Sequence, residues 1–160
     1  MIVRPYQDED FAAFSRLVIR YFQEDLQIGW TEAQLQRLAV KMQGLNGTGR
    51  HWILVLENEE EGTLEGFLEY QIDGPDLGWN YRPGDGFIRE SYVVPEYRRL
   101  GFARKMTKTA EQGLLEAGVR QVYLTCDNAC HIWERLGYED TGELCSINGG
   151  KVYTKDAARY

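Results

Sequence analysis

Apolar and polar positions along the chain follow two spacings, and the switch between them marks the predicted elements. Apolar residues three or four apart indicate a helix with one buried face, whereas alternation indicates a strand. Helices are predicted over residues 9–26, between 31 and 44, over 102–117, and in a short segment between 128 and 137. Strands are predicted at 1–6, 51–57, 64–72, 87–94, 121–126, 141–147 and 151–155.

Capping residues support these helix boundaries. Asp8 precedes the first apolar stripe and is expected to cap that helix. Thr31 and Gln34 have the spacing of a capping box for the second helix. Gly118 is expected to end the helix that begins at Phe102, and Asn128 is expected to cap the short helix.

The resulting order is β-α-α-β-β-β-α-β-α-β-β, which predicts a mixed α/β or α+β fold. The stretch "GPDLGWNYRPGDG", residues 74–86, is too long for a tight turn and is predicted to be a loop. No repeat, linker or low-complexity segment interrupts the pattern. We therefore expect residues 1–160 to form one domain.

Composition is typical of a soluble globular protein, with 43% hydrophobic and 27% charged residues. No run reaches the roughly 18 apolar residues of a membrane span, and the first residues lack the layout of a signal peptide. A cytoplasmic location without membrane association is therefore expected. In such a reducing compartment the three cysteines predict no disulfide framework.

The chain is acidic overall but has one basic stretch. The formal charge is −7, which argues against a nucleic-acid partner because phosphate binding needs a basic face. One stretch reverses this sign, since Glu96 is its only acid beside five basic residues: Arg98, Arg99, Arg104, Lys105 and Lys108.

This basic stretch lies at a predicted helix N-terminus, which already carries partial positive charge. An anion there would be bound by backbone N–H groups of the first turn. Gly101 has no side chain, so a ligand can approach the backbone closely. The nucleotide signatures GxGxxG and GxxxxGK[ST] are missing. The pattern therefore predicts a cradle for a different phosphate ligand.

Arg98-x-x-Gly101-x-Ala103 resembles the Arg/Gln-x-x-Gly-x-Gly/Ala loop of the GNAT superfamily of acyl-CoA N-acyltransferases. The preceding Val93-Val94-Pro95 matches the family's V-x-P. "YLTCDNACHIWERLGY", residues 123–138, is similar to the family's strand, Asn and short helix ending in Gly-aromatic. The resemblance covers the whole order of elements and is specific over 87–142. It implies a GNAT-like fold, a mixed central sheet of about seven strands with helices on both faces.

The resemblance also implies how coenzyme A would be held. Backbone amides of residues 99–104 would bind its pyrophosphate, and the strand end before the loop would pair with its pantetheine arm. The implied cofactor-binding residues are Val93, Val94, Arg98, Arg99, Gly101, Phe102, Ala103, Arg104, Asn128 and Trp133. Asn128 as a simple helix cap and Trp133 as core packing are the alternatives.

Acyl transfer to an amine needs a neutral amine, and an alkylammonium pKa near ~10.4 leaves about one molecule in a few thousand neutral at pH 7. Glu90 is the candidate base, because it is an acid on an otherwise apolar face of the strand that precedes the loop. The alternative is an ion pair with Arg89 or Arg82. Tyr92, on the same face, is the second catalytic candidate, with plain packing as its alternative.

The family's usual leaving-group acid is a tyrosine four residues before the glycine that ends the short helix. Trp133 occupies that position in this chain, and an indole N–H cannot give up its proton at neutral pH. A thiol pKa near ~8.5 makes the thiolate a tolerable leaving group without a positioned acid. Solvent, Tyr92 or Cys130 remain candidates for the proton donor.

Other candidates are weaker. Trp79 and Tyr81 in the long loop are predicted to stack on a cationic amine, with packing on the sheet edge as the alternative. Cys126, Cys130 and His131 lack a second cluster that would complete four ligands, so no metal is predicted.

The sequence therefore predicts an N-acetyltransferase that uses acetyl-CoA and a small primary amine by direct transfer in a ternary complex. The alternatives are a catalytically weak acyl-CoA-binding or regulatory domain, and an enzyme that acetylates proteins or peptides. A homodimer stays open. Acceptor identity and acyl-chain length cannot be read from these residues.

Overall fold

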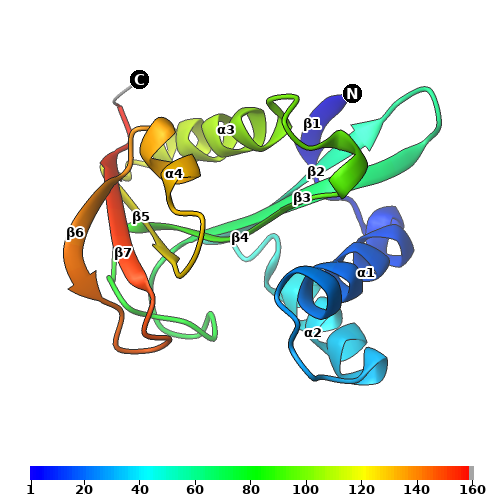
Figure 1. Cartoon of the computed structure of the whole chain (residues 1–160), viewed down its shortest axis with the longest axis horizontal. Helices are drawn as coiled ribbons and strands as arrows, with labels where there is room; N and C mark the ends of the chain where they lie inside the picture. Colours follow the sequence, from blue (N-terminus) through cyan, green and yellow to red (C-terminus); the bar gives the residue numbers. More distant parts are fainter. Residues whose placement is uncertain (159–160) are drawn as a thin grey trace. The chain divides into compact units, whose positions relative to one another are not determined.

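The computed structural model describes residues 1–158 and has the predicted order of elements (Figure 1). Its strands are β1 (Ile2–Pro5), β2 (His51–Asn58), β3 (Thr63–Ile72), β4 (Gly86–Val93), β5 (Gln121–Cys126), β6 (Glu139–Leu144) and β7 (Lys151–Asp156). Its α-helices are α1 (Phe11–Arg20), α2 (Glu32–Leu45), α3 (Phe102–Glu116) and α4 (His131–Arg135). Shorter turns are η1 (Asp8–Asp10), the π turn η2 (Tyr21–Asp25) and η3 (Pro95–Tyr97).

The seven strands are hydrogen-bonded in the order β1-β2-β3-β4-β5-β7-β6. β4 pairs with β5 in parallel, whereas β1 with β2, β5 with β7, and β6 with β7 are antiparallel. The chain divides into two compact units. Unit 1 comprises Met1–Glu69 and Glu90–Met106, and unit 2 comprises Tyr70–Arg89 and Thr107–Tyr160.

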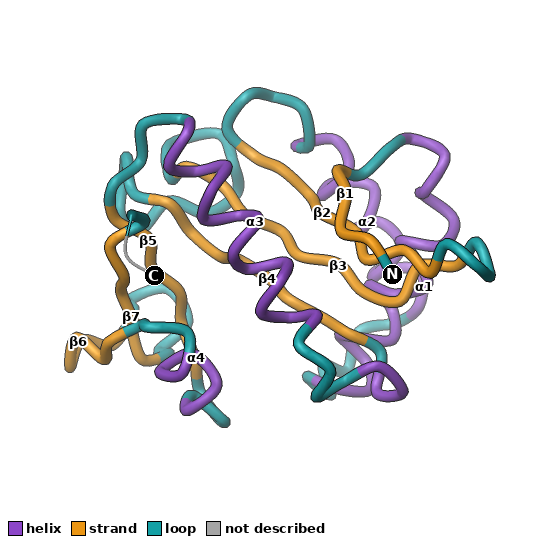
Figure 2. Tube along the Cα trace, turned by 90° about the horizontal axis from the view of Figure 1, so that it is seen from above, coloured by secondary structure: helices purple, strands orange, loops and turns teal. Residues whose placement is uncertain are grey.

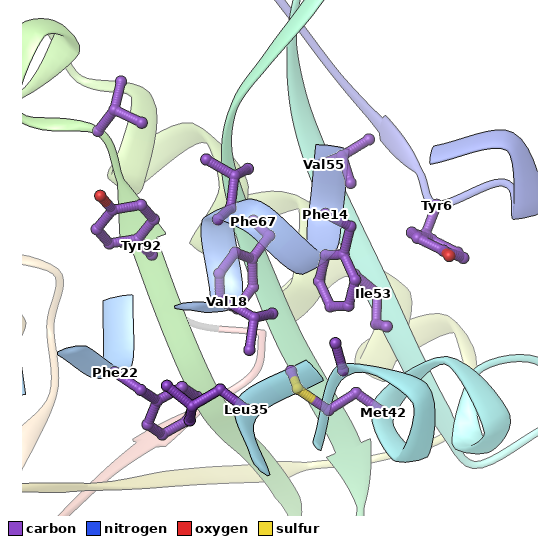
Figure 3. Packing of buried hydrophobic residues seen from close by; sticks show 13 residues of the cluster. Tyr6, Phe14, Val18, Phe22, Leu35, Met42, Ile53, Val55, Phe67 and Tyr92 are labelled. Atoms are coloured by element: carbon purple, nitrogen blue, oxygen red, sulfur yellow. The ribbon is translucent and has the colours of Figure 1, made fainter. Parts of the chain in front are cut away.

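Unit 1 has a core between its two helices and the strands β2, β3 and β4 (Figure 3). In Figure 1, α1 and α2 lie side by side against these strands. Phe14 is fully buried and meets the rings of Tyr6 and Phe67 edge-on, each at 5.2 Å between centroids. The apolar spacing read from the sequence therefore faces this core, and so does Tyr92 of β4.

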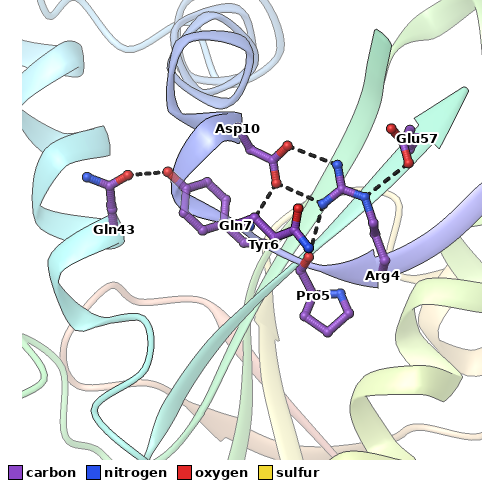
Figure 4. A network of polar contacts seen from close by, with 7 residues as sticks. All are labelled: Arg4, Pro5, Tyr6, Gln7, Asp10, Gln43 and Glu57. Atoms are coloured by element: carbon purple, nitrogen blue, oxygen red, sulfur yellow. Dashed lines mark hydrogen bonds and ion pairs between the residues drawn. The ribbon is translucent and has the colours of Figure 1, made fainter. Parts of the chain in front are cut away.

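The start of the first helix differs from the prediction. Asp10, rather than Asp8, makes the capping contact, because its carboxylate accepts the Gln7 backbone N–H at 2.8 Å. The same carboxylate binds the Arg4 guanidinium at 2.8 and 2.9 Å, and Arg4 also pairs with Glu57 of β2 (Figure 4). Asp10 thus completes a capping box with Gln7, the N-cap of η1, and its contact with Arg4 ties this helix start to β1.

The first helix also ends differently. α1 stops at Arg20, and the chain continues through the π turn η2 instead of a regular α-helix to residue 26. The Leu26 N–H donates to the Tyr21 carbonyl at 3.0 Å, which is the i→i+5 bond of a π turn. The second helix begins as predicted, since the Thr31 hydroxyl accepts the Gln34 N–H and Gln34 bonds back to the Thr31 N–H.

Unit 2 contains β5, β6 and β7, which run beside one another in Figure 2. The α3 residues Ala110 and Leu114 are fully buried. A Cβ on Gly86 would lie 2.7 Å from Leu114, so the glycine allows β4 to approach the helix. A second cluster, with Phe87 and Tyr123 stacked at 4.5 Å, completes the core of this unit.

The segment between β5 and α4 corrects two predictions. α4 begins at His131 with Cys130 at its N-cap, so Asn128 is not the cap. Ala129 has a φ of +56°, which turns the chain before the helix starts. Cys126 and Cys130 form a disulfide, with Cα atoms 5.8 Å apart, so the expectation of no disulfide was wrong. Cys145 is a buried free thiol.

Candidate active site

Loop 98–101 joins η3 to the first turn of α3. Gly101 has a φ of +88° and Arg99 a φ of +64°, so both lie in the left-handed region. A Cβ on Gly101 would have no atom within 4 Å, and this side of the loop is therefore open. The first-turn N–H groups of the 15-residue helix α3 carry the positive end of its dipole. The loop thus fits a phosphate ligand.

The basic side chains around this loop are of two kinds. Arg99 and Arg104 are exposed, as expected for groups that attract an anion. Arg98 is held within unit 1, because its Nε donates to the Val93 carbonyl at 2.7 Å and its Nη2 pairs with Asp25 at 2.6 Å. Arg98 is nevertheless 41% exposed, so its outer edge remains accessible to solvent.

The end of β4 is fixed by its own backbone contacts. The Val94 N–H donates to the Glu65 carbonyl at 2.9 Å, and the Val94 carbonyl accepts the Tyr97 N–H at 3.0 Å. A Cβ on Gly66 would lie 2.6 Å from the Tyr92 carbonyl, so glycine is required where β3 approaches β4. The amide and carbonyl of Val94 are thus both bonded within the protein, and its side chain is buried in the core of unit 1, so its contact with a pantetheine arm stays a prediction.

Glu90, the predicted base, lies on β4 and accepts a hydrogen bond from the Tyr21 hydroxyl at 2.5 Å. Burial, together with the charges of Glu90, Asp25 and Glu69, raises the pKa of Tyr21 well above its usual value. The phenol is consequently the donor and the carboxylate the acceptor. Tyr21 was not predicted as a site residue, because its apolar spacing in the sequence marks it only as part of the core.

The two arginines considered as ion-pair partners for Glu90 both have contacts elsewhere. Arg82 pairs with Glu143 at 2.9 Å. Arg89 donates to the side-chain oxygen of Gln71 at 2.9 Å.

Tyr92 lies two residues after Glu90 and is 2% exposed. Within residues 1–158 its hydroxyl is buried and has no hydrogen-bond partner. Burial raises its pKa, and the nearby guanidinium groups of Arg20 and Arg98 partly oppose this shift. The Arg98 guanidinium lies 5.5 Å from the centre of the Tyr92 ring. A buried hydroxyl without a partner costs about 1–3 kcal/mol, which a ligand acceptor would recover.

Asn128 and Trp133, the other two predicted coenzyme contacts, belong to unit 2. Asn128 is exposed in the loop between β5 and α4. Trp133 is half-buried on α4, and its ring meets Tyr138 edge-on at 5.9 Å. The packing alternative for Trp133 therefore has a specific contact, and its role toward a ligand stays a prediction.

The long loop of unit 2 is held by one buried carboxylate. Asp73 accepts the backbone N–H groups of Tyr81 at 3.1 Å and Arg82 at 2.9 Å, and the Tyr123 hydroxyl. Burial raises the pKa of Asp73, and these hydrogen bonds partly oppose the shift. Asp73 was missed in the sequence, where it is simply the residue before the loop.

The predicted acceptor aromatics lie on this loop. Trp79 stacks on Phe87 at 5.0 Å and donates its indole N–H to the Tyr123 hydroxyl at 2.9 Å. Tyr81 lies 5.8 Å from the Tyr123 ring and hydrogen-bonds Glu143. Both rings thus contribute to packing in unit 2, as the alternative had it, and their stacking on an amine stays a prediction.

Residues 1–158 bring no group of His, Cys, Asp and Glu side chains together in a way that could hold a metal ion. Over the same residues, none of the helices combines the length and apolar character needed to cross a membrane.

Comparison with known proteins decides the family. The sequence model of the Acetyltransferase (GNAT) family matches residues 11–138. The chain belongs to this family. None of the curated proteins matches the sequence.

Solved GNAT structures share the fold. A GNAT acetyltransferase from Staphylococcus aureus Mu50 is 11% identical, with a TM-score of 0.76 over 98% of each chain. Aminoglycoside 6'-acetyltransferase type Ii is 15% identical, with a TM-score of 0.76 over 100% of this chain and 99% of that one. PaiA N-acetyltransferase from Thermoplasma acidophilum, solved with coenzyme A, is 15% identical, with a TM-score of 0.68 over 97% and 98%. The predicted GNAT-like fold, a mixed seven-stranded sheet with helices, is therefore confirmed.

Proposed function

We propose that this protein is an N-acetyltransferase that moves the acetyl group of acetyl-CoA directly to a primary amine of a small molecule. The observation that carries the proposal lies on one strand of unit 1. β4 carries the hydrogen-bonded carboxylate of Glu90 and is followed, after the short turn η3, by the open loop at Gly101. A base and an anion cradle are the two parts that this reaction requires.

Coenzyme A would be bound by this loop. The backbone amides of residues 99–104 and the exposed guanidinium groups of Arg99 and Arg104 would hold its pyrophosphate. Support comes from PaiA N-acetyltransferase, a GNAT protein of the same fold that was solved in complex with coenzyme A. Asn128 and Trp133 of unit 2 remain proposed contacts of the pantetheine arm.

Glu90 would accept a proton from the amine, since an alkylammonium with a pKa near ~10.4 cannot attack. The neutral amine then forms a bond to the thioester carbonyl carbon, and the carbon–sulfur bond breaks as the nitrogen releases its second proton, which goes through solvent to the thiolate. Glu90 returns the first proton to solvent. The thiolate leaves with the electron pair of that bond and takes up a proton to give free coenzyme A. Acetyl group, protons and electrons balance without a further reactant.

Tyr92 is the group proposed to stabilise the reacting thioester. Its buried hydroxyl lacks a protein partner among residues 1–158. Burial raises its pKa, so the phenol would remain a hydrogen-bond donor and would not transfer its proton completely to a thiolate whose conjugate acid has a pKa near ~8.5. Trp133 stands where the family usually has a tyrosine, which leaves a catalytically weak acyl-CoA-binding domain as the second candidate.

The test measures thiol release from acetyl-CoA with a panel of small amines and with peptides. Turnover with a small amine is the expected result. Tight coenzyme A binding without turnover on any acceptor would favour the second candidate, and turnover on peptides alone would make the enzyme a protein acetyltransferase.

The donor site is tested by Gly101→Val with calorimetry. We expect coenzyme A affinity to fall at least tenfold, about 1.4 kcal/mol, because a side chain would enter the open side of the loop. Gly62→Val is the matched control, since Gly62 also has a positive φ, +67°, and open space around it, but lies in the β2–β3 turn. Equal affinity in the folded Gly101→Val protein would reject the cradle.

A further inference from the structure

The π turn η2 reaches the proposed active site with the side chains at both of its ends. Tyr21 at its start donates to Glu90 at 2.5 Å. Asp25 at its end pairs with Arg98 of the donor loop at 2.6 Å. One turn of five residues therefore holds both the carboxylate and the loop. Interruptions of this kind in a helix are frequent at functional sites.

Tyr21 is fixed by aromatic packing as well as by its hydrogen bond. Its ring lies 4.9 Å from Phe22, 5.9 Å from Phe67 and 5.4 Å from Tyr92. The first two contacts are edge-on, an arrangement that aromatic pairs favour. The hydroxyl is thus held in one position, and it fixes the orientation of the Glu90 carboxylate.

Charged groups around the pair come from every neighbouring element. Glu90 of β4, Asp25 of the π turn and Glu69 of β3 all raise the pKa of Tyr21, after burial itself. Glu69 lies 2.6 Å from His51 of β2. Arg20, Glu24 and Arg98 act on the neighbouring Tyr92. Because negative charge predominates around Tyr21, its phenol keeps its proton.

We propose that Tyr21 is a positioning residue for the proposed acetyl transfer, whose hydroxyl orients the Glu90 carboxylate to accept the proton of the amine. This inference rests on the function proposed above. A hydrogen bond donated to a carboxylate favours its charged form, and burial alone would do the opposite. Tyr21 is not a catalytic residue, because its hydroxyl acts on Glu90 and not on the substrate.

The experiment compares Tyr21→Phe with Tyr6→Phe across a pH series. Tyr6 is the matched control, because it is also a buried tyrosine of unit 1 whose hydroxyl bonds a side chain, that of Gln43. In Tyr21→Phe we expect kcat/KM at pH 7 to fall about ten- to hundredfold with unchanged coenzyme A affinity. The acidic limb of the kcat/KM-against-pH profile of Tyr21→Phe should move to higher pH by roughly one unit, because the carboxylate of residue 90 loses the hydrogen bond from the Tyr21 hydroxyl. Tyr6→Phe should show neither change.

A double-mutant cycle with Glu90→Gln separates positioning from general stabilisation. If Tyr21 acts through Glu90, adding Tyr21→Phe to Glu90→Gln should lower the rate no further. Additive losses, or a Tyr21→Phe enzyme with the wild-type rate and pH profile, would overturn the inference and leave the acetyltransferase assignment standing. Absence of transfer by the wild-type protein would overturn both.

A second variant covers the case in which Tyr21→Phe does not fold. Site-specific 3-fluorotyrosine at position 21 keeps the ring and the hydroxyl but makes the phenol a stronger donor. The acidic limb of the kcat/KM-against-pH profile should then move to lower pH. An unchanged profile would count against the inference.

Discussion

Tyr21 and Tyr138 each donate a hydrogen bond to a glutamate, and the glutamate of the second pair also binds a buried lysine. In unit 1, Tyr21 bonds Glu90 at 2.5 Å, and in unit 2, Tyr138 bonds Glu111 at 2.7 Å. In both, burial and the neighbouring carboxylate raise the pKa of the tyrosine. The phenol is therefore a neutral donor in each pair.

The difference lies in the third group. Lys155 contacts both oxygens of Glu111, at 3.0 and 3.1 Å, and also lies 5.5 Å from the Tyr138 ring. The side chains of Lys155 and Glu111 are only 2% and 6% exposed. The charge of Glu111 is thus used inside the fold. Glu90 is half-buried on the strand that leads to the donor loop, and it accepts the hydrogen bond of the Tyr21 phenol. Similar local pairs can thus differ in role, with Glu111 in a buried ion pair and Glu90 as the proposed proton acceptor.

Glu90→Gln should show the largest effect on catalysis. The amide keeps the shape of the side chain and removes the base, so kcat at pH 7 should fall by about 10²–10⁴-fold in a thiol-release assay. Coenzyme A affinity should barely change. The deficit should shrink as the pH rises, because more of the amine then arrives already neutral.

Two results with Glu90→Gln would contradict a catalytic role for Glu90. Near-full kcat in Glu90→Gln would make this glutamate structural, like Glu111. Loss of the fold would have the same meaning, and circular dichroism of the variant decides between a missing base and a missing fold.

Glu111→Gln should do the reverse. Removing one partner of a buried ion pair leaves Lys155 charged and uncompensated, which typically costs about 3–5 kcal/mol of unfolding free energy. Urea unfolding should show this loss. In native buffer, kcat per folded molecule should match the wild type, because Glu111 has no part in the proposed chemistry.

The double variant Glu111→Leu with Lys155→Met is the control for this prediction. Replacing a buried pair by apolar groups is often neutral or stabilising, so its loss should be much smaller than that of Glu111→Gln. A folded Glu111→Gln protein with a catalytic defect as large as that of Glu90→Gln would remove the distinction between the two glutamates.

The contrast also shows what the sequence can predict. The order of all strands and helices followed from apolar spacing, and the loop at Gly101 followed from a local run of charge and a glycine. Glu90 was found because an acid on an apolar strand face is conspicuous. These features depend on neighbours in the chain, which a single sequence displays directly.

Other features could not be predicted, because they depend on contacts between residues far apart in the sequence or on irregular backbone conformations. Tyr21 is 69 positions from Glu90 in the sequence. Because Tyr21 lies in the apolar stripe of the first helix, the sequence predicts a core residue and does not indicate a polar contact of its hydroxyl. A π turn leaves no mark in a 3.6-residue spacing, so the first helix was predicted to continue to residue 26. Because the chain turns at Ala129, the N-cap of α4 is Cys130 and not Asn128. Residue preferences at helix caps do not predict this difference.

Trp133 offers the smallest and last test, because its ring packs on Tyr138 of the structural pair. Trp133→Tyr and Trp133→Phe differ only by a hydroxyl, so their ratio isolates the effect of a phenol at the family's usual acid position. We expect both to lose at most about 1 kcal/mol of unfolding free energy, from a smaller edge-on contact. Their kcat values should agree within about threefold, since a thiolate with a conjugate-acid pKa near ~8.5 leaves without a positioned acid. A Trp133→Tyr enzyme ten times faster than Trp133→Phe would show that position 133 reaches the sulfur.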